Sequence, residues 1–257
     1  MPVPLYVDRY GVGSPLIILH GLFGSSVNWR PIGRFLSQQY RVLAVDLRNH
    51  GRSPHADTMN YGQMVSDVFA LMDREALQQA TFMGHSMGGK VAMLAALQRP
   101  QRVLELVVVD IAPVQYRRDY GQIITAMQRV DLKRVTRRAD ADTQLRQWIT
   151  DKRLRGFLLQ NLVNDGGQYR WRIALSAIAR ALPDLLGFPQ QSPKQRFWAR
   201  SLFVRGEQSD YITPQVYPVI HAHFPSATIV SIPEAAHWVH ADQPKRFQAA
   251  LQHFFRR

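Results

Sequence analysis

The sequence predicts an α/β fold, in which a mostly parallel, twisted sheet is flanked by helices and carries a helical insertion. Short apolar segments alternate along the chain with longer segments whose apolar residues recur at helical spacing. The 257 residues are 46% hydrophobic and 20% charged, a composition typical of a globular protein with a sizeable core. The absence of cysteine excludes disulfide scaffolds, thiol catalysis and cysteine-ligated zinc.

Four strands are expected in the first half of the chain. Each is a short run of aliphatic side chains, and the last of them is nearly continuous in branched aliphatics, as is typical of a parallel strand covered on both faces. A helix is expected over residues 90–97 and must stop by Pro100. The predicted strands are residues 16–19, 41–45, 80–83 and 104–109.

Two further strands and a final helix are expected towards the C-terminus. Residues 201–204 and 228–232 have the composition of buried strands, and the stretch from Pro244 to Phe255 repeats apolar side chains at helical spacing. We therefore assign residues 1–112 and 201–257 to a single α/β core.

Residues 113–200 differ from the rest of the chain. They contain no convincing strand run, and their apolar residues recur at helical intervals, as in Leu154, Phe157 and Leu158. They also hold 17 Lys and Arg residues against seven Asp, and so carry +10 of the formal net charge of +13. We expect a helical cap inserted at one edge of the sheet. Its charge would either steer an anionic substrate to the core or form a solvated surface.

The strongest motif is Gly84-His85-Ser86-Met87-Gly88, which matches the G-x-S-x-G nucleophile elbow. A predicted strand ends just before it, and a helix rich in Ala and Leu begins just after it, which is the context the motif requires. The start of that helix would place a positive dipole beside the hydroxyl. Ser86 is therefore the candidate nucleophile, against the alternative of a glycine turn with an incidental serine.

The same stretch has a second interpretation. Residues 84–90 spell G-x-x-x-x-G-K, the front of a phosphate-binding loop, and Leu106–Asp110 resembles the magnesium-holding strand of nucleotide hydrolases. Val91 stands where such a loop needs the hydroxyl of Ser or Thr to bind Mg²⁺. A nucleotide hydrolase is the weaker interpretation.

A second glycine-rich segment, His20–Gly24, follows the first predicted strand. Acyl transfer needs two backbone N–H donors aimed at the tetrahedral oxyanion. The elbow supplies one from the residue after the nucleophile, Met87, and a loop nearer the N-terminus supplies the other. We expect Leu22 to be that second donor, with Phe23 as the fallback; the alternative is an ordinary turn at a strand end.

Among nine histidines, His237 is the candidate general base. It lies after the last predicted strand and before the last helix, and so it follows the serine as the order Ser, acid, His of this motif demands. His240 is the alternative in the same segment. His20 and His85 lie inside the two motifs, where we expect them to support the loops.

Two aspartates qualify as the acid that would orient His237. Asp110 terminates the strand after the elbow helix, and Asp210 follows the strand 201–204. Both would lie at the same sheet edge as Ser86, and spacing alone does not separate them.

These segments together resemble the α/β-hydrolase superfamily, and the resemblance runs along the whole chain. It rests on His20–Gly24, Asp46–Ser53, Gly84–Gly89 and His237-Trp238. Val109–Pro113 paired with Arg205–Asp210 is similar to a narrower group, the small bacterial acyl-CoA esterases and thioesterases and their mitochondrial abhydrolase-domain relatives.

In that group the acid follows the strand after the elbow, and a serine occupies the place where most of the superfamily has its acid, as Ser209 does here. The resemblance therefore implies Asp110 as the acid, with Asp210 as the runner-up and Ser209 as an auxiliary partner of His237. It also implies short acyl esters or acyl-CoA thioesters as substrates.

The expected function is thus a serine esterase or thioesterase that needs no cofactor. Carbon–carbon bond hydrolases and cofactorless perhydrolases use the same residue types and stay open, whereas Ser86 argues against dehalogenases, which carry Asp there. A hydrolase-like binding protein without turnover is an alternative of another class.

Nucleic acid and metal ions are not expected partners. Residues 169–172 and 197–200 mix aromatic with basic side chains, which superficially fits a stacking surface, but aromatics at this spacing more often pack inside a cap. His221 and His223 lack a third ligand at a recognised spacing.

No secretory or membrane segment is expected, because Asp8 and Arg9 interrupt the N-terminal stretch. The longest apolar runs fall far short of the roughly 20 residues of a membrane helix. We expect a cytoplasmic protein; acyl-chain length and oligomeric state are left open.

Overall fold

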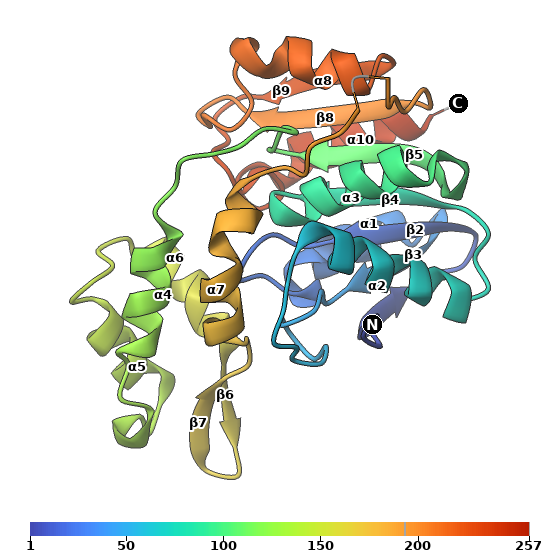
Figure 1. Ribbon diagram of the computed structural model, residues 1–257. Coiled ribbons are helices and arrows are strands. Elements are labelled where there is room, and N and C mark those ends of the chain that lie inside the picture. Colours follow the sequence, from blue (N-terminus) through green and yellow to red (C-terminus); the bar gives the residue numbers. More distant parts are fainter. Residues whose placement is uncertain (193, 257) are drawn as a thin grey trace.

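The computed structural model describes residues 1–192 and 194–256, and it confirms the predicted fold class. A seven-stranded sheet lies between helices, and a separate group of short elements sits at one end of it (Figure 1). The strands run in the order β1-β3-β2-β4-β5-β8-β9. Their bounds are β1 Val7–Tyr10, β2 Ser14–Leu19, β3 Tyr40–Val45, β4 Ala80–His85, β5 Val103–Val109, β8 Ser201–Gly206 and β9 Ala227–Ile232.

All neighbouring strands of this sheet pair in parallel except β1, which is antiparallel to β3 at the edge. β1 was not predicted from the sequence. It has only four residues and includes Asp8 and Arg9. An edge strand can carry such polar side chains because it needs to bury only one of its faces, so it lacks a continuous apolar run.

Helices cover both faces of the sheet. Successive side chains of β2 point to opposite faces and therefore pack against different helices. Leu16 and Ile18 pack in a cluster with residues of α1 and α10, whereas Ile17 and Leu19 pack with residues of α2 and α3. The core helices are α1 Arg30–Leu36, α2 Tyr61–Arg74, α3 Met87–Gln98, α8 Tyr217–His223, α9 Val239–Asp242 and α10 Pro244–Phe255.

The cap segment, residues 113–200, contains helices and also a small hairpin. Its helices are α4 Tyr120–Gln128, α5 Arg138–Leu145, α6 Lys152–Leu158 and α7 Leu175–Leu186, and the hairpin strands are β6 Leu162–Asp165 and β7 Gln168–Trp171. The expectation that this segment holds no strand is wrong. The strands have only four residues each and mix apolar with polar side chains. The turn between them is Gly166-Gly167, both with positive φ, which is a two-residue hairpin signal.

The cap is joined to the core by hydrogen bonds at the end of α7, one of them buried and two partly buried. The Lys90 amine, on α3, donates to the carbonyl of Leu186 at 3.0 Å and also to that of Gly187. The Tyr61 hydroxyl donates to the carbonyl of Leu185 at 2.6 Å. The helix that follows the elbow is therefore attached directly to the cap. None of the helices in the described ranges has the length and apolar character needed to cross a bilayer.

The sheet register brings the two central loops of the site together. His85, the last residue of β4, pairs with Val109, the last residue of β5, and Val109 pairs with Val204 of β8. Ser86 and Asp110 therefore leave the same edge of the sheet from adjacent strands.

Candidate active site

Ser86 occupies a strained turn between β4 and α3. Its φ is +51°, a left-handed conformation that non-glycine residues rarely adopt. Its N–H donates to the carbonyl of Val109 at 3.0 Å. A Cβ on Gly88 would lie 2.4 Å from the carbonyl oxygen of Leu19, and one on Gly84 would lie 2.2 Å from that of Gly88. The motif glycines are thus required by close backbone packing.

His237, in the loop between β9 and α9, connects Ser86 to Asp110. Its Nε2 lies 3.1 Å from Ser86 Oγ, and its Nδ1 lies 2.8 Å from Asp110 Oδ2. The ring also stacks on Tyr211, with centroids 3.9 Å apart. The sequence-predicted serine, histidine and first-choice acid therefore form one continuous chain of hydrogen bonds.

The Asp110 carboxylate is fully buried and accepts several hydrogen bonds. Oδ1 accepts from the Gly206 N–H at 3.0 Å, and the Ser209 hydroxyl donates to Oδ2. Ser209 thus contacts the carboxylate itself, and its hydroxyl is not bonded to the His237 ring where we had expected it. These contacts fix the carboxylate towards His237 and satisfy a buried charge.

Asp210, the runner-up acid, lies elsewhere. Its side chain is 70% exposed and is paired with Arg118 of the cap segment. That guanidinium holds the pKa of Asp210 below its usual range. The structure does not bring Asp210 into hydrogen-bond contact with His237.

The N–H groups next to Ser86 differ in their availability. Phe23, at φ +62°, donates its N–H to His50 Nε2 at 3.2 Å. The Leu22 N–H has no acceptor in the part of the chain that the structure describes, and Leu22 lines the pocket at Ser86. Met87 begins α3, where helix N–H groups have no partner inside the helix. Leu22 and Met87 are therefore better placed than Phe23 to bind an oxyanion.

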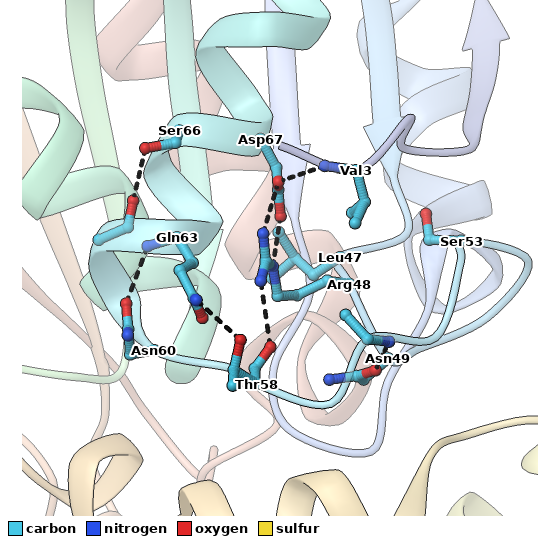
Figure 2. Close-up of polar contacts among 12 residues, drawn as sticks. Val3, Leu47, Arg48, Asn49, Ser53, Thr58, Asn60, Gln63, Ser66 and Asp67 are labelled. Atoms are coloured by element: carbon cyan, nitrogen blue, oxygen red, sulfur yellow. Dashed lines mark hydrogen bonds and ion pairs between the residues drawn. The ribbon is translucent and has the colours of Figure 1, made fainter. Parts of the chain in front are cut away.

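The loop after β3 supports this donor loop, and sequence reasoning did not find its contacts. Asp46 Oδ1 accepts from the Ser26 N–H at 2.6 Å, and His20 Nε2 accepts from the Leu47 N–H at 3.0 Å. Arg48 forms a bidentate pair with Asp67 of α2, at 2.6 and 2.8 Å, with both side chains buried (Figure 2). The polar residues of Asp46–Ser53 thus hold the loop in place.

Four more histidines surround the site and are buried. Burial lowers the pKa of His20 to about 4, that of His50 to about 3 and that of His240 to about 4, and it lowers the pKa of His85 well below its usual value. His85 Nε2 donates to the His237 carbonyl at 2.9 Å, and His240 stacks on Trp29. These neutral rings support the loops, and of these five described histidines only His237 forms a hydrogen bond with the Ser86 hydroxyl.

Phosphate or metal binding gains no support from the geometry. The Lys90 amine, which a phosphate loop would use, points to the cap carbonyls. Within residues 1–192 and 194–256, no group of three His, Asp or Glu side chains could hold a metal ion.

Comparison with known proteins gives consistent results. A family model described as alpha/beta hydrolase fold matches residues 14–244. The sn-1-specific diacylglycerol lipase ABHD11 of Danio rerio is 42% identical, over 97% of this chain and 82% of that protein. The esterase YbfF of Escherichia coli is 35% identical over 94% and 92% of the two chains. Among solved structures, a marine microorganism esterase superposes with a TM-score of 0.95 at 38% identity, covering 98% of this chain and all of that one.

Proposed function

Because the chain belongs to the alpha/beta hydrolase fold family, we propose that it hydrolyses carboxylic esters through an acyl-enzyme on Ser86. The observation that carries the proposal is the unbroken hydrogen-bond chain from Ser86 through His237 to the buried Asp110. The similarity to proteins named esterase and lipase supports the same reaction class.

In the first half of the reaction, His237 Nε2 takes the proton of Ser86 as Oγ attacks the ester carbonyl. The carbonyl oxygen becomes an oxyanion, which the N–H groups of Leu22 and Met87 would bind. The imidazolium then gives its proton to the alkoxy oxygen, and the alcohol leaves as the acyl-enzyme forms.

In the second half, water attacks the acyl-enzyme and gives a proton to His237. The tetrahedral intermediate collapses, Ser86 Oγ regains the proton from His237, and the carboxylic acid is released. Asp110 fixes the tautomer of His237 and stabilises its charged form, while Gly206 and Ser209 hold the carboxylate.

Acyl-CoA thioesters are a second candidate substrate class of the same site. The cap segment carries +10 of the net charge of +13, and such a field favours approach of a polyanionic substrate. Hydrolysis of a thioester would use the same residues, with a thiol as the leaving group.

Replacement of the nucleophile tests the proposal. Ser86→Ala should lower kcat for p-nitrophenyl acetate by roughly 10⁶-fold, because the three residues act as a unit, and should abolish covalent labelling by a fluorophosphonate. Ser66→Ala removes an exposed hydroxyl on α2 and serves as the matched control, with wild-type turnover and labelling. Unchanged hydrolysis by Ser86→Ala would exclude the proposed mechanism, and a wild-type protein that neither labels nor turns over would be a binding protein.

A further inference from the structure

Two pockets meet at Ser86 and share Leu22 and Tyr120 as walls. The histidine-side pocket also contains His237, Phe157 and Trp238. The tyrosine-side pocket also reaches Ser86, and its lining includes Tyr61, Tyr116, Tyr211, Lys90, Leu182 and Leu185. Among the described residues, His237 lines the first pocket and not the second.

A groove continues the histidine-side pocket towards solvent. The two share Asn28, Phe157, Trp238 and His240 as lining residues, so they adjoin. The volume of the groove is about 580 Å³, against about 70 Å³ for the histidine-side pocket and about 30 Å³ for the tyrosine-side pocket. Space on the two sides of Ser86 is therefore very unequal.

The chemistry of ester cleavage indicates which part of the substrate each pocket would hold. The group that protonates the leaving alcohol must lie within hydrogen-bond reach of the alkoxy oxygen, and in this site that group is His237 Nε2. The alcohol must therefore occupy the side of Ser86 that His237 lines. With the oxyanion turned to Leu22 and Met87, the remaining substituent of the tetrahedral carbon, the acyl chain, faces the tyrosine side.

We propose that the protein cleaves esters in which a short acyl group is joined to a larger, amphipathic alcohol; this inference rests on the proposed function. The acyl group occupies the tyrosine-side pocket, and the alcohol runs through the histidine-side pocket into the groove.

Contacts around the tyrosine-side pocket set the limit on acyl length. Tyr61 donates to the carbonyl of Leu185, and Lys90 donates to that of Leu186. Two of its walls are thus hydrogen-bonded to one another across the boundary between core and cap. Because a buried Lys90 amine is costly to move away from these acceptors, the pocket resists widening to admit a long chain.

The groove has the surface that an amphipathic alcohol needs. Phe157 and Trp238 pack their rings together 5.3 Å apart at its inner end. Further out, Asn28 donates to Gln160 at 2.7 Å, and the Arg153 guanidinium lies over the Trp238 ring. An apolar inner part followed by amide and guanidinium groups suits an alcohol with a hydrocarbon portion and a polar end.

Two ester series separate the spaces. In the first, p-nitrophenyl esters vary the acyl group from acetate to dodecanoate; in the second, acetates vary the alcohol through methanol, benzyl alcohol and 1-octanol. The wild-type kcat/KM should fall with acyl length in the first series and should rise or hold with alcohol size in the second.

Each space then has its own variant. Gly156, on α6, lines the groove, and a Cβ there would meet nothing within 4 Å, so Gly156→Trp introduces an indole at the groove from a position where the Cβ itself is unobstructed. It should lower kcat/KM for octyl acetate about tenfold or more relative to methyl acetate.

Leu182→Ala enlarges the tyrosine-side pocket. It should raise the ratio of kcat/KM for p-nitrophenyl hexanoate to that for the acetate about tenfold, and Leu182→Trp should lower the same ratio. Thr143→Trp places the same indole on exposed α5 and should leave both series unchanged.

A crossed result overturns the assignment: Gly156→Trp acting on the acyl series, or the Leu182 variants acting on the alcohol series, would place the two groups the other way round. A wild-type preference for long acyl chains also overturns it. These outcomes require ester hydrolysis, whereas absence of both hydrolysis and fluorophosphonate labelling would instead contradict the proposed function on which the assignment rests.

Discussion

One ion pair of the α/β core and one ion pair of the cap segment differ sharply in their exposure to solvent. In the core, Arg48 and Asp67 are almost wholly buried and bond to each other through two pairs of atoms. In the cap segment, Arg170 and Asp165 are paired while more than half exposed, and most of the protein's net charge is found there. The core therefore fixes the positions of Ser86, His237 and Asp110, while the cap segment supplies walls of the pockets at Ser86 and most of the net charge.

The largest expected effect separates the two aspartates. Asp110→Asn should reduce kcat for p-nitrophenyl acetate by roughly 10⁴-fold, because an amide at this position favours the wrong tautomer of the base histidine. Asp210→Asn should change kcat by less than about tenfold, because exposed ion pairs such as the one with Arg118 contribute little. Steady-state kinetics of the two variants decide the matter, and a large loss in Asp210→Asn alone would reverse the assignment.

The second effect compares a core ion pair with a cap ion pair. Arg48→Met leaves the buried Asp67 carboxylate without its partner and should lower the free energy of unfolding by about 3–5 kcal/mol. Arg170→Met removes an exposed pair and should cost under about 1 kcal/mol. Urea denaturation measures both.

A double variant refines this comparison. Arg48→Met combined with Asp67→Leu removes both charges, and it should recover much of the loss of the single variant, since paired buried charges and well-packed apolar residues are often nearly equivalent. Equal destabilisation by Arg48→Met and Arg170→Met would contradict the distinction between the two regions.

The third effect is the dependence of stability on pH. His20, His50 and His240 have pKa values of about 4, 3 and 4 in the folded protein, below the value of about 6.5 in an unfolded chain. The unfolded state therefore binds more protons between pH 6.5 and about 4, so stability is fully present above pH 6.5 and is lost as the pH falls through this window. Urea midpoints at pH 7, 5.5 and 4.5 should decrease in that order.

A matched pair of variants locates the source of this loss. His50→Gln keeps a side-chain acceptor for the Phe23 N–H and should make the fall of stability with pH shallower. His253→Gln changes an exposed residue of α10 and should leave the slope as it is. Identical slopes in all three proteins would show that His50 is not involved.

The smallest expected effect concerns the charge of the cap segment. Replacing exposed Arg134 and Arg137 with Gln should lower kcat/KM for an acyl-CoA a few-fold at low salt, with little change for uncharged p-nitrophenyl acetate. The difference should disappear as salt is added. An acyl-CoA rate that is insensitive to both salt and substitution would mean that the charge forms only a solvated surface.

The sequence was most informative for strands that are buried on both faces of the sheet. The runs at 16–19 and 104–109 predicted β2 and β5 because central parallel strands are almost entirely apolar. β1 and the β6–β7 hairpin were not predicted because each strand has only four residues, mixes apolar with polar side chains and is partly exposed, so it lacks the continuous apolar run of the central strands. The Gly166-Gly167 pair was the one local sign of the hairpin.

At the site, local motifs could be found and long-range contacts could not. The elbow identified Ser86 because a strand, a tight turn and a helix occur within a few residues. Asp110 and Asp210 looked alike because each follows a strand that ends at one sheet edge. What distinguishes them is the Gly206 N–H, the Ser209 hydroxyl and the Arg118 guanidinium, which reach them from 92 to 99 residues away in the chain. The Arg48–Asp67 pair was hidden for the same reason.

The bond of Lys90 to the end of α7 limits how the two regions can be recombined. Burial lowers the pKa of Lys90 to about 7. Even the neutral amine keeps two protons, one for each of the carbonyls of Leu186 and Gly187, so both hydrogen bonds persist when Lys90 loses its charge. A chimera that received a different cap would have to present two backbone acceptors at the same point. Otherwise the graft would leave the Lys90 amine buried without an acceptor. Lys90 lies in the first turn of α3, which directly follows Ser86, so the unsatisfied amine would destabilise the turn that holds the proposed nucleophile.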